Sequence, residues 1–247
     1  MVRVHRIQHV ALASRDVAAA HRFYAGQLGL PVGNFDPEEG LLALRLADGF
    51  VLRFEAGPAP GVRFLGLELE SFEAVDRAFR RFSDRVALDL RARYRDRPGP
   101  YGFFLEDPDG YRVKLFKYGP RHGRAKPTAG RKEAGRRLAF LVLHTPDIEG
   151  MKAFYQGLGL KVQADYGRWV TFETGPAALA LHQAEGGEAT RGAGIFLEVG
   201  DVDALYRELK EKGLDADPPE DREFGYRTFL LKDPQGNLVE LGEPMRP

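Results

Sequence analysis

Short apolar runs with strand periodicity alternate with amphipathic stretches along the whole chain. Residues 7–13, IQHVALA, form the first apolar run and predict a strand. In residues 17–28 apolar side chains recur every three or four positions, which predicts a helix that ends at Gly29. Two further runs, 41–46 and 50–54, predict a hairpin. The chain therefore begins with a unit of one strand, one helix and about three more strands.

The same unit returns three more times. Strands are predicted over residues 62–69, 138–144 and 194–199, and each precedes an amphipathic helix. Further strands are predicted over 169–173 and 177–182. The buried faces expected for the three helices are, in order, Phe72, Val75, Phe79 and Phe82; Ile148, Met151, Phe154 or Tyr155, and Leu158; and Val202, Leu205 and Leu209.

Two short motifs mark the repetition. Phe-Tyr followed by Leu-Gly-Leu occurs at 23–30 and again at 154–160. Asp-Pro-x-Gly occurs at 107–110 and at 233–236, where proline and glycine supply the dihedral angles of a tight turn between strands. A unit that exposes one apolar sheet face cannot bury it alone, so the units must pair. The pattern predicts an α+β fold of four βαβββ modules paired into two domains, 1–119 and 137–247.

A basic segment separates the two pairs. Residues 121–137 hold seven Lys or Arg, one acid and few apolar side chains, which predicts a solvated linker over about 120–136. A nucleic-acid-binding arm is not expected, because no aromatic residue interleaves the charges.

Composition narrows the functional class. The 36 basic and 36 acidic residues balance, so no net field attracts nucleic acid or a membrane. The chain has no cysteine, which excludes disulfides, thiolate metal sites and a cysteine nucleophile. The N-terminal residues lack the apolar core of a signal peptide, and no apolar run approaches the roughly 20 residues of a membrane span. We therefore expect a cytoplasmic protein.

The Phe-Tyr…Leu-Gly-Leu helix end and the Asp-Pro-x-Gly-x-x-Val-Glu strand resemble those of the vicinal oxygen chelate superfamily. This family includes glyoxalase I, bleomycin resistance proteins and extradiol ring-cleaving dioxygenases, and four modules in one chain look most like the two-domain dioxygenases. The resemblance implies two half-barrels per domain around a divalent metal. It also implies metal ligands near the start of each module's first strand and a carboxylate on its last strand.

The positions implied by the resemblance are only partly filled by metal ligands. In the N-terminal pair they fall on His9, Phe64, Arg53 and Lys114, and in the C-terminal pair on Phe140, Ala180, Gly194 and Glu240. Of the two histidines and one carboxylate of a dioxygenase iron site, only Glu240 remains. Residues 221–223, Asp-Arg-Glu, occupy the neighbourhood of the family's catalytic histidine before the last turn.

Two interpretations of the N-terminal positions stay open. A metal is disfavoured there, because Arg53 and Lys114 would repel it. His9 is either a strand imidazole hydrogen-bonded to a neighbour such as Glu68 or Glu55, or part of an anion site with Arg53 and Lys114.

The C-terminal pair offers candidates for ligand binding. His144, His182 and Glu198 lie on the same strand faces as the family's ligand positions, so with Trp169 and Glu240 they are expected to line a barrel cavity. A relocated metal triad of His144, His182 and Glu240 is the alternative, although four residues along a strand span roughly 13 Å. In the simplest interpretation His144 caps the third helix and His182 ends a strand in solvent. Glu240 needs a partner if buried, and Arg227 or Arg168 is expected.

We therefore predict a glyoxalase/bleomycin resistance/dioxygenase-like protein that binds a small organic ligand, with an incomplete metal triad and no cofactor. The alternative is a metal-dependent extradiol-type dioxygenase, or a related lyase or isomerase, with Fe(II) or another divalent metal at relocated ligands. The sequence assigns no catalytic residue, and it is compatible with a homo-oligomer.

Overall fold

The computed structural model describes residues 3–119, 136–184 and 193–245. The N-terminal domain contains β1 (Val4–Ser14), α1 (Val17–His21), η1 (Arg22–Gln27), β2 (Val32–Asp36), β3 (Leu41–Arg45), β4 (Val51–Ala56), β5 (Gly61–Leu69), α2 (Phe72–Arg81), η2 (Ser83–Arg85), β6 (Val86–Asp89), α3 (Arg91–Tyr94), β7 (Pro100–Glu106) and β8 (Arg112–Tyr118). The C-terminal domain contains β9 (Arg137–Thr145), α4 (Ile148–Gly157), β10 (Lys161–Asp165), β11 (Trp169–Glu173), β12 (Ala178–Gln183), β13 (Ala193–Glu198), α5 (Val202–Glu211), β14 (Glu220–Arg222), β15 (Tyr226–Lys232) and β16 (Leu238–Pro244). The predicted linker lies outside the described residues, apart from Arg136.

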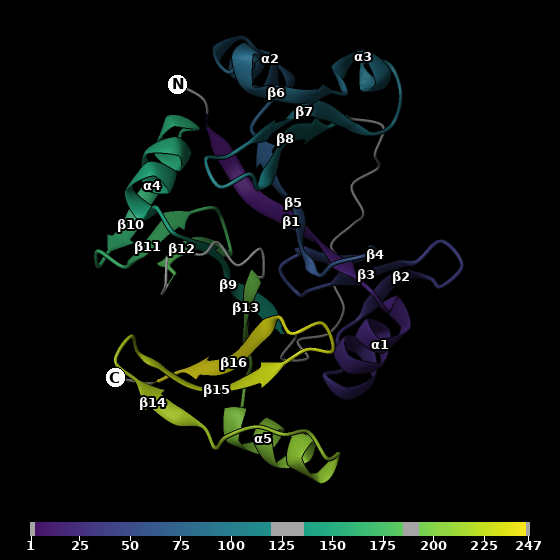
Figure 1. Ribbon diagram of the computed structural model, residues 1–247, viewed down its shortest axis with the longest axis vertical. Helices are drawn as coiled ribbons and strands as arrows, with labels where there is room; N and C mark the ends of the chain where they lie inside the picture. Colours follow the sequence, from purple (N-terminus) through teal and green to yellow (C-terminus); the bar gives the residue numbers. More distant parts are fainter. Residues whose placement is uncertain (1–2, 120–135, 185–192, 246–247) are drawn as a thin grey trace.

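The two domains repeat one sheet topology (Figure 1). The first eight-stranded sheet has the order β2-β3-β4-β1-β5-β8-β7-β6, and the second has the order β10-β11-β12-β9-β13-β16-β15-β14. In each sheet two modules join through their first strands, because β1 pairs antiparallel with β5 and β9 pairs antiparallel with β13. This confirms the predicted α+β fold of four βαβββ modules in two pairs.

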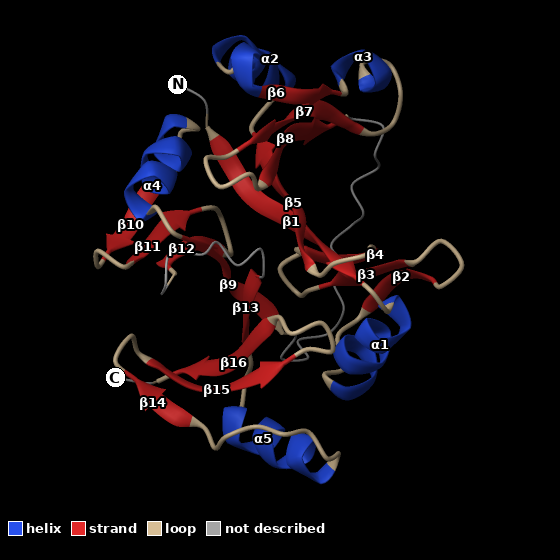
Figure 2. Ribbon diagram, in the orientation of Figure 1, coloured by secondary structure: helices blue, strands red, loops and turns tan. Residues whose placement is uncertain are grey.

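The helices lie at the periphery of the molecule (Figure 2), and α1, α2, α4 and α5 begin at side-chain caps. Asp16, Ser71, Asp147 and Asp201 each accept a hydrogen bond from a backbone N–H of the first helical turn. The buried faces predicted for α4 and α5 are confirmed. Asp147 is the cap of α4, so the prediction that His144 caps this helix is wrong.

Of the face predicted for α2, Val75 is buried and the three phenylalanines are half-buried against the core, whereas the buried Ala74 and Ala78 were not predicted. Ala74, Val75 and Ala78 are the buried residues of α2, because these small side chains let the helix lie close to the sheet. Phe72 and Phe79 are half-buried at its edge, and Phe82 follows the end of the helix. The predicted first helix is also split, since α1 continues as the π-helical turn η1.

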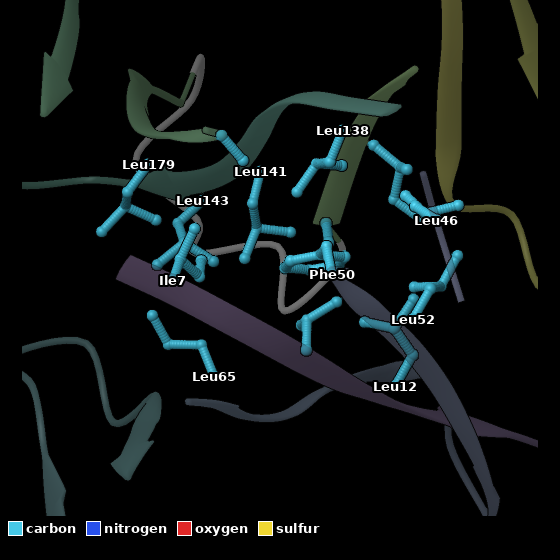
Figure 3. Close-up of a cluster of buried hydrophobic side chains, with 14 of the residues drawn as sticks. Ile7, Leu12, Leu46, Phe50, Leu52, Leu65, Leu138, Leu141, Leu143 and Leu179 are labelled. Carbon is cyan, nitrogen blue, oxygen red and sulfur yellow. The ribbon is translucent and has the colours of Figure 1, made fainter. Parts of the chain in front are cut away.

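The two sheets pack against each other through their outer faces. Apolar side chains of β1, β4 and β5 meet those of β9 and β12 in one buried cluster (Figure 3), which includes Ile7, Leu12, Leu52, Leu141 and Leu179. Each sheet bends about its two central strands, so its other, inner face is turned away from the partner domain (Figure 2). No described helix is long and apolar enough to cross a membrane.

The repeated motifs meet across the domain boundary. The Tyr24 hydroxyl donates to Asp233 Oδ2 at 2.8 Å, and the Tyr155 hydroxyl donates to Asp107 Oδ2 at 3.0 Å. Each Phe-Tyr helix end therefore contacts the Asp-Pro-x-Gly turn of the other domain. Because all four side chains are buried, these reciprocal bonds fix how the two domains pack.

Candidate functional site

The inner face of the C-terminal sheet carries the candidate site. Successive side chains of a strand point to opposite faces of the sheet, so Phe140, Val142 and His144 of β9 share this face. Phe196 of β13 pairs with both Phe140 and Glu240, which places these three in one row across the middle of the sheet. Trp169, His182 and His144 form a second row across β11, β12 and β9.

Aromatic rings cover the middle of this face. The Phe140 ring stacks on Phe196 with centroids 5.5 Å apart, and Trp169 meets Phe140 edge-on at 6.3 Å. Tyr226 lies edge-on to Phe196 at 5.1 Å. Phe224, which is exposed, lies 6.3 Å from Phe196 at the rim. The face therefore offers flat apolar surfaces with different orientations, which suits a planar organic molecule.

The structure brings His144 and His182 together. Their Nδ1 atoms lie 3.3 Å apart, and the His182 ring lies 5.8 Å from Trp169. Burial, and next the neighbouring His182, lower the pKa of His144 below its ordinary value. One imidazole can donate and the other accept only when at least one of them is neutral. His182 lies near the end of β12 as predicted, but it is half-buried beside His144, so the prediction that it lies in solvent is wrong.

Glu240 has a partner other than the two expected. Its carboxylate accepts a hydrogen bond from Thr228 and lies near the cation of Arg222, while burial raises its pKa above the ordinary value. Arg227 instead pairs with Asp203 and Asp221 on the neighbouring elements. Arg168 directly precedes β11, where its backbone carbonyl accepts from the N–H of Gln183.

Glu198 lies at the opposite end of the face from the two histidines. It pairs with Arg137 at 2.7 Å and accepts from the Tyr226 hydroxyl at 3.2 Å. The strand register places Glu240 level with Phe140, four residues before His144, which corresponds to roughly 13 Å along the sheet. Of the five predicted ligand-binding residues, His144, His182 and Trp169 lie in one row of the sheet. Glu240 lies further along the strands from this row, and Glu198 lies further still.

The donor set of this face does not fit a family-type metal. Within residues 3–119, 136–184 and 193–245, no three His, Asp or Glu side chains converge as metal ligands, so the alternative triad of His144, His182 and Glu240 is not formed. A side chain added at Gly194 would place its Cβ 2.9 Å from the Cβ of Val142. The family position at Gly194 is thus filled by a neighbouring side chain, and Phe140 offers no donor atom.

The N-terminal sheet holds its three predicted residues on one inner face. His9 on β1 lies beside Gly66 on β5, and Gly66 lies beside Lys114 on β8. Arg53 on β4 is close enough to lower the pKa of both His9 and Lys114. The predicted partners of His9 are wrong: its Nδ1 contacts Gln8 Oε1, because a register shift between Ile7 and His9 turns Gln8 inward.

Sequence reasoning missed Gln8 and Thr228, and it did not identify Arg222 as the cation near Glu240 or Tyr226 as a partner of Glu198. Thr228 and Tyr226 alternate along β15, so a strand assigned to residues 226–232 would have placed them on one face near Glu240. Arg222 lies on the three-residue strand β14, and Gln8 at a bulge; neither has a periodic signal.

Comparisons with known proteins agree with this architecture. A Mn(II)-bound glyoxalase from Novosphingobium aromaticivorans is 20% identical, with 100% of this chain and 84% of that chain covered and a TM-score of 0.76. Homoprotocatechuate 2,3-dioxygenase from Brevibacterium fuscum, in complex with 3,4-dihydroxyphenylacetate, is 18% identical over 99% of this chain and 82% of that one, with a TM-score of 0.74. The 2,3-dioxygenase LapB from Pseudomonas sp. KL28 is 15% identical over 98% of this chain and 93% of that chain, with a TM-score of 0.73.

These solved structures establish the likeness of fold at low identity. No curated protein matches the sequence. The profile of one superfamily matches residues 6–115 and 137–241, that is, both module pairs. The chain therefore belongs to the Glyoxalase/Bleomycin resistance protein/Dioxygenase superfamily.

Proposed function

We propose that this protein binds a small, flat organic molecule on the inner face of its C-terminal sheet, without the family's metal, in the cytoplasm. The ligand lies against the half-buried rings of Phe140 and Trp169, and the buried ring of Phe196 supports Phe140. The His144–His182 pair and Glu240 flank this aromatic surface and bond polar groups at opposite edges of the ligand.

One observation carries the proposal. The row across the middle of the sheet holds Phe140 and Glu240, which occupy two of the family's ligand positions, and Phe196 between them, whose ring stacks on Phe140. Apolar rings at these positions favour contact with a carbon skeleton. Glu240 is half-buried beside Thr228 and Arg222, so it accepts hydrogen bonds from a hydroxyl or amine group without needing a dication.

The alternative function is metal-dependent ring cleavage, or a related lyase or isomerase reaction. The adjacent imidazoles of His144 and His182 favour it to a limited extent, since two histidines are part of many metal sites. The neighbours named above include a Mn(II)-bound enzyme and two dioxygenases. Because the third ligand is missing from the described part of the chain, we derive no reaction step through a metal.

Trp169 gives a direct test, because it is the single tryptophan of the chain. Phenol, catechol and 2-naphthol are titrated into the protein in excess EDTA while tryptophan fluorescence is recorded. We expect saturable quenching by at least the two-ring phenol. The variant Phe196→Leu should weaken binding about tenfold, since it removes the buried ring on which Phe140 is stacked.

Phe79→Leu is the matched control, because Phe79 is a half-buried phenylalanine of the other domain. This variant should bind as the wild type does. Quenching that occurs only after Fe(II) or Mn(II) is added would favour the alternative function. A response that is equal in Phe196→Leu and in the wild type would remove the proposed binding face.

A further inference from the structure

The inner face of the N-terminal sheet holds a lysine inside a group of phenyl rings. The Lys114 ammonium lies 5.4 Å from the ring centroids of Phe104 and Phe116 and 6.0 Å from that of Phe64. Lys114 is 8% exposed. Such rings attract a cation through their faces, but they do not replace the hydrogen bonds that water gives an ammonium.

Lys114 forms no direct ion pair among the described residues, although the charge of Glu55 acts on it. Two acidic side chains on the neighbouring strands β4 and β5 are each already shared between two cations. Glu55 pairs with Arg53 at 2.7 Å and with Arg63 at 2.8 Å. Glu68 pairs with Arg6 and Lys117, both at 3.0 Å. The surroundings of Lys114 therefore carry an excess of positive charge that an incoming anion would neutralise.

His9 completes this surface as a neutral group. Its ring packs flat over Gly66, where any side chain would collide with it, and it contacts Phe64 and Phe116. Burial, and then the cations of Lys114 and Arg53, lower the pKa of His9 to about 3. The imidazole therefore serves as an uncharged hydrogen-bonding group at neutral pH, with Gln8 on its Nδ1.

We propose that this N-terminal face is a second binding site, independent of the C-terminal one, for the carboxylate of a small aromatic acid. The carboxylate pairs with Lys114, Arg53 adds a second positive charge, and His9 lies at its side. The phenyl rings of Phe64 and Phe104 contact the apolar body of the ligand. A single negative charge matches the one buried ammonium, whereas a dianion such as phosphate would leave charge desolvated among phenyl rings.

The test uses sodium benzoate and its neutral analogue benzamide, at matched ionic strength, with the melting temperature and calorimetric binding as readouts. Benzoate should raise the melting temperature of the wild-type protein and benzamide should not. In Lys114→Met the affinity for benzoate should fall at least about tenfold, because one member of a buried charge pair is lost. Methionine suits the site, since its thioether packs well against aromatic rings.

Lys117→Met is the matched control, because Lys117 lies on the same strand, is 27% exposed and pairs with Glu68. This variant should keep the benzoate response. Affinity should also fall as the pH rises from 7 to 10, because burial and Arg53 lower the pKa of Lys114 to about 8, while Glu55 opposes this shift. His9, which also faces Lys114, stays neutral over this range.

Two results would overturn the proposal: an equal response of the wild type to benzoate and benzamide, or an unchanged benzoate affinity in Lys114→Met. Trp169 fluorescence distinguishes binding at the two faces, because Trp169 is the single tryptophan of the chain and lies in the C-terminal domain. Benzoate binding that quenches Trp169 and survives the Lys114 substitution would assign the anion to the C-terminal face instead. Should Lys114→Met fail to fold, Lys114→Gln replaces it in the same comparison.

Discussion

Replacing Asp233 by alanine is expected to lower the free energy of unfolding by about 3–5 kcal/mol, because one buried carboxylate serves four donors. Asp233 is 5% exposed and accepts from the Tyr24 hydroxyl, from the backbone N–H groups of Gln235 and Asn237, and from the Asn237 side chain, all at 2.8–2.9 Å. Alanine leaves these buried donors without an acceptor. Urea unfolding at neutral pH measures the loss.

Two further variants separate the turn from the domain contact. Tyr24→Phe removes only the bond between domains and should cost about 1–3 kcal/mol. Asp215→Ala changes an exposed aspartate of the same domain and should stay within about 0.5 kcal/mol of the wild type. A loss below about 1 kcal/mol for Asp233→Ala would show that the Asp-Pro-x-Gly turns do not hold the domains together.

Lys114→Met is expected to stabilise the protein by about 3 kcal/mol at pH 7 in a buffer without organic anions. The pKa of Lys114 is lowered from 10.5 to about 8, so the folded protein releases this proton more readily than the unfolded chain. The charged lysine therefore destabilises the fold fully below about pH 8. This penalty disappears as the pH rises towards 10.5, where the unfolded chain also loses the proton.

The pH dependence distinguishes this effect from a simple gain in packing. Urea unfolding of both proteins at pH 7, 9 and 10.5 should show the advantage of Lys114→Met shrinking steadily. Lys117→Met, which loses the ion pair with Glu68, should show no gain at any of these pH values. A variant less stable than the wild type at pH 7, or an advantage that is constant with pH, would mean that Lys114 is not an uncompensated cation.

Local and repeated features of the fold could be predicted from the sequence. The four modules are marked by the 3.6-residue and two-residue periods of their apolar positions, and the paired topology follows from the need to bury one face of each module. Features set by contacts distant in sequence could not be. Tyr24 and Asp233 both belong to motifs that the sequence displays twice, yet their contact depends on how the domains pack.

The same limit applies to the candidate site: the face on which a side chain lies could be predicted, but its partners on other strands could not. Alternation placed His144 and His182 on the correct faces, but only the parallel register of β9 and β12 brings their rings together. The partners of Glu240 were missed because Thr228 and Arg222 come from strands whose pairing has no local signal. A bulge in β1 turns Gln8 to the same face as His9, so the two side chains are in contact. A strictly alternating pattern would have placed them on opposite faces.

The metal content of the purified protein tests the central claim, that the C-terminal face works without the family's metal. The protein is incubated with Fe(II), Mn(II) or Zn(II), freed of excess ion, and measured by elemental analysis beside Glu240→Gln. The account predicts well under one ion per chain and no difference between the two proteins. About one tightly bound ion per chain, lost in Glu240→Gln, would contradict it.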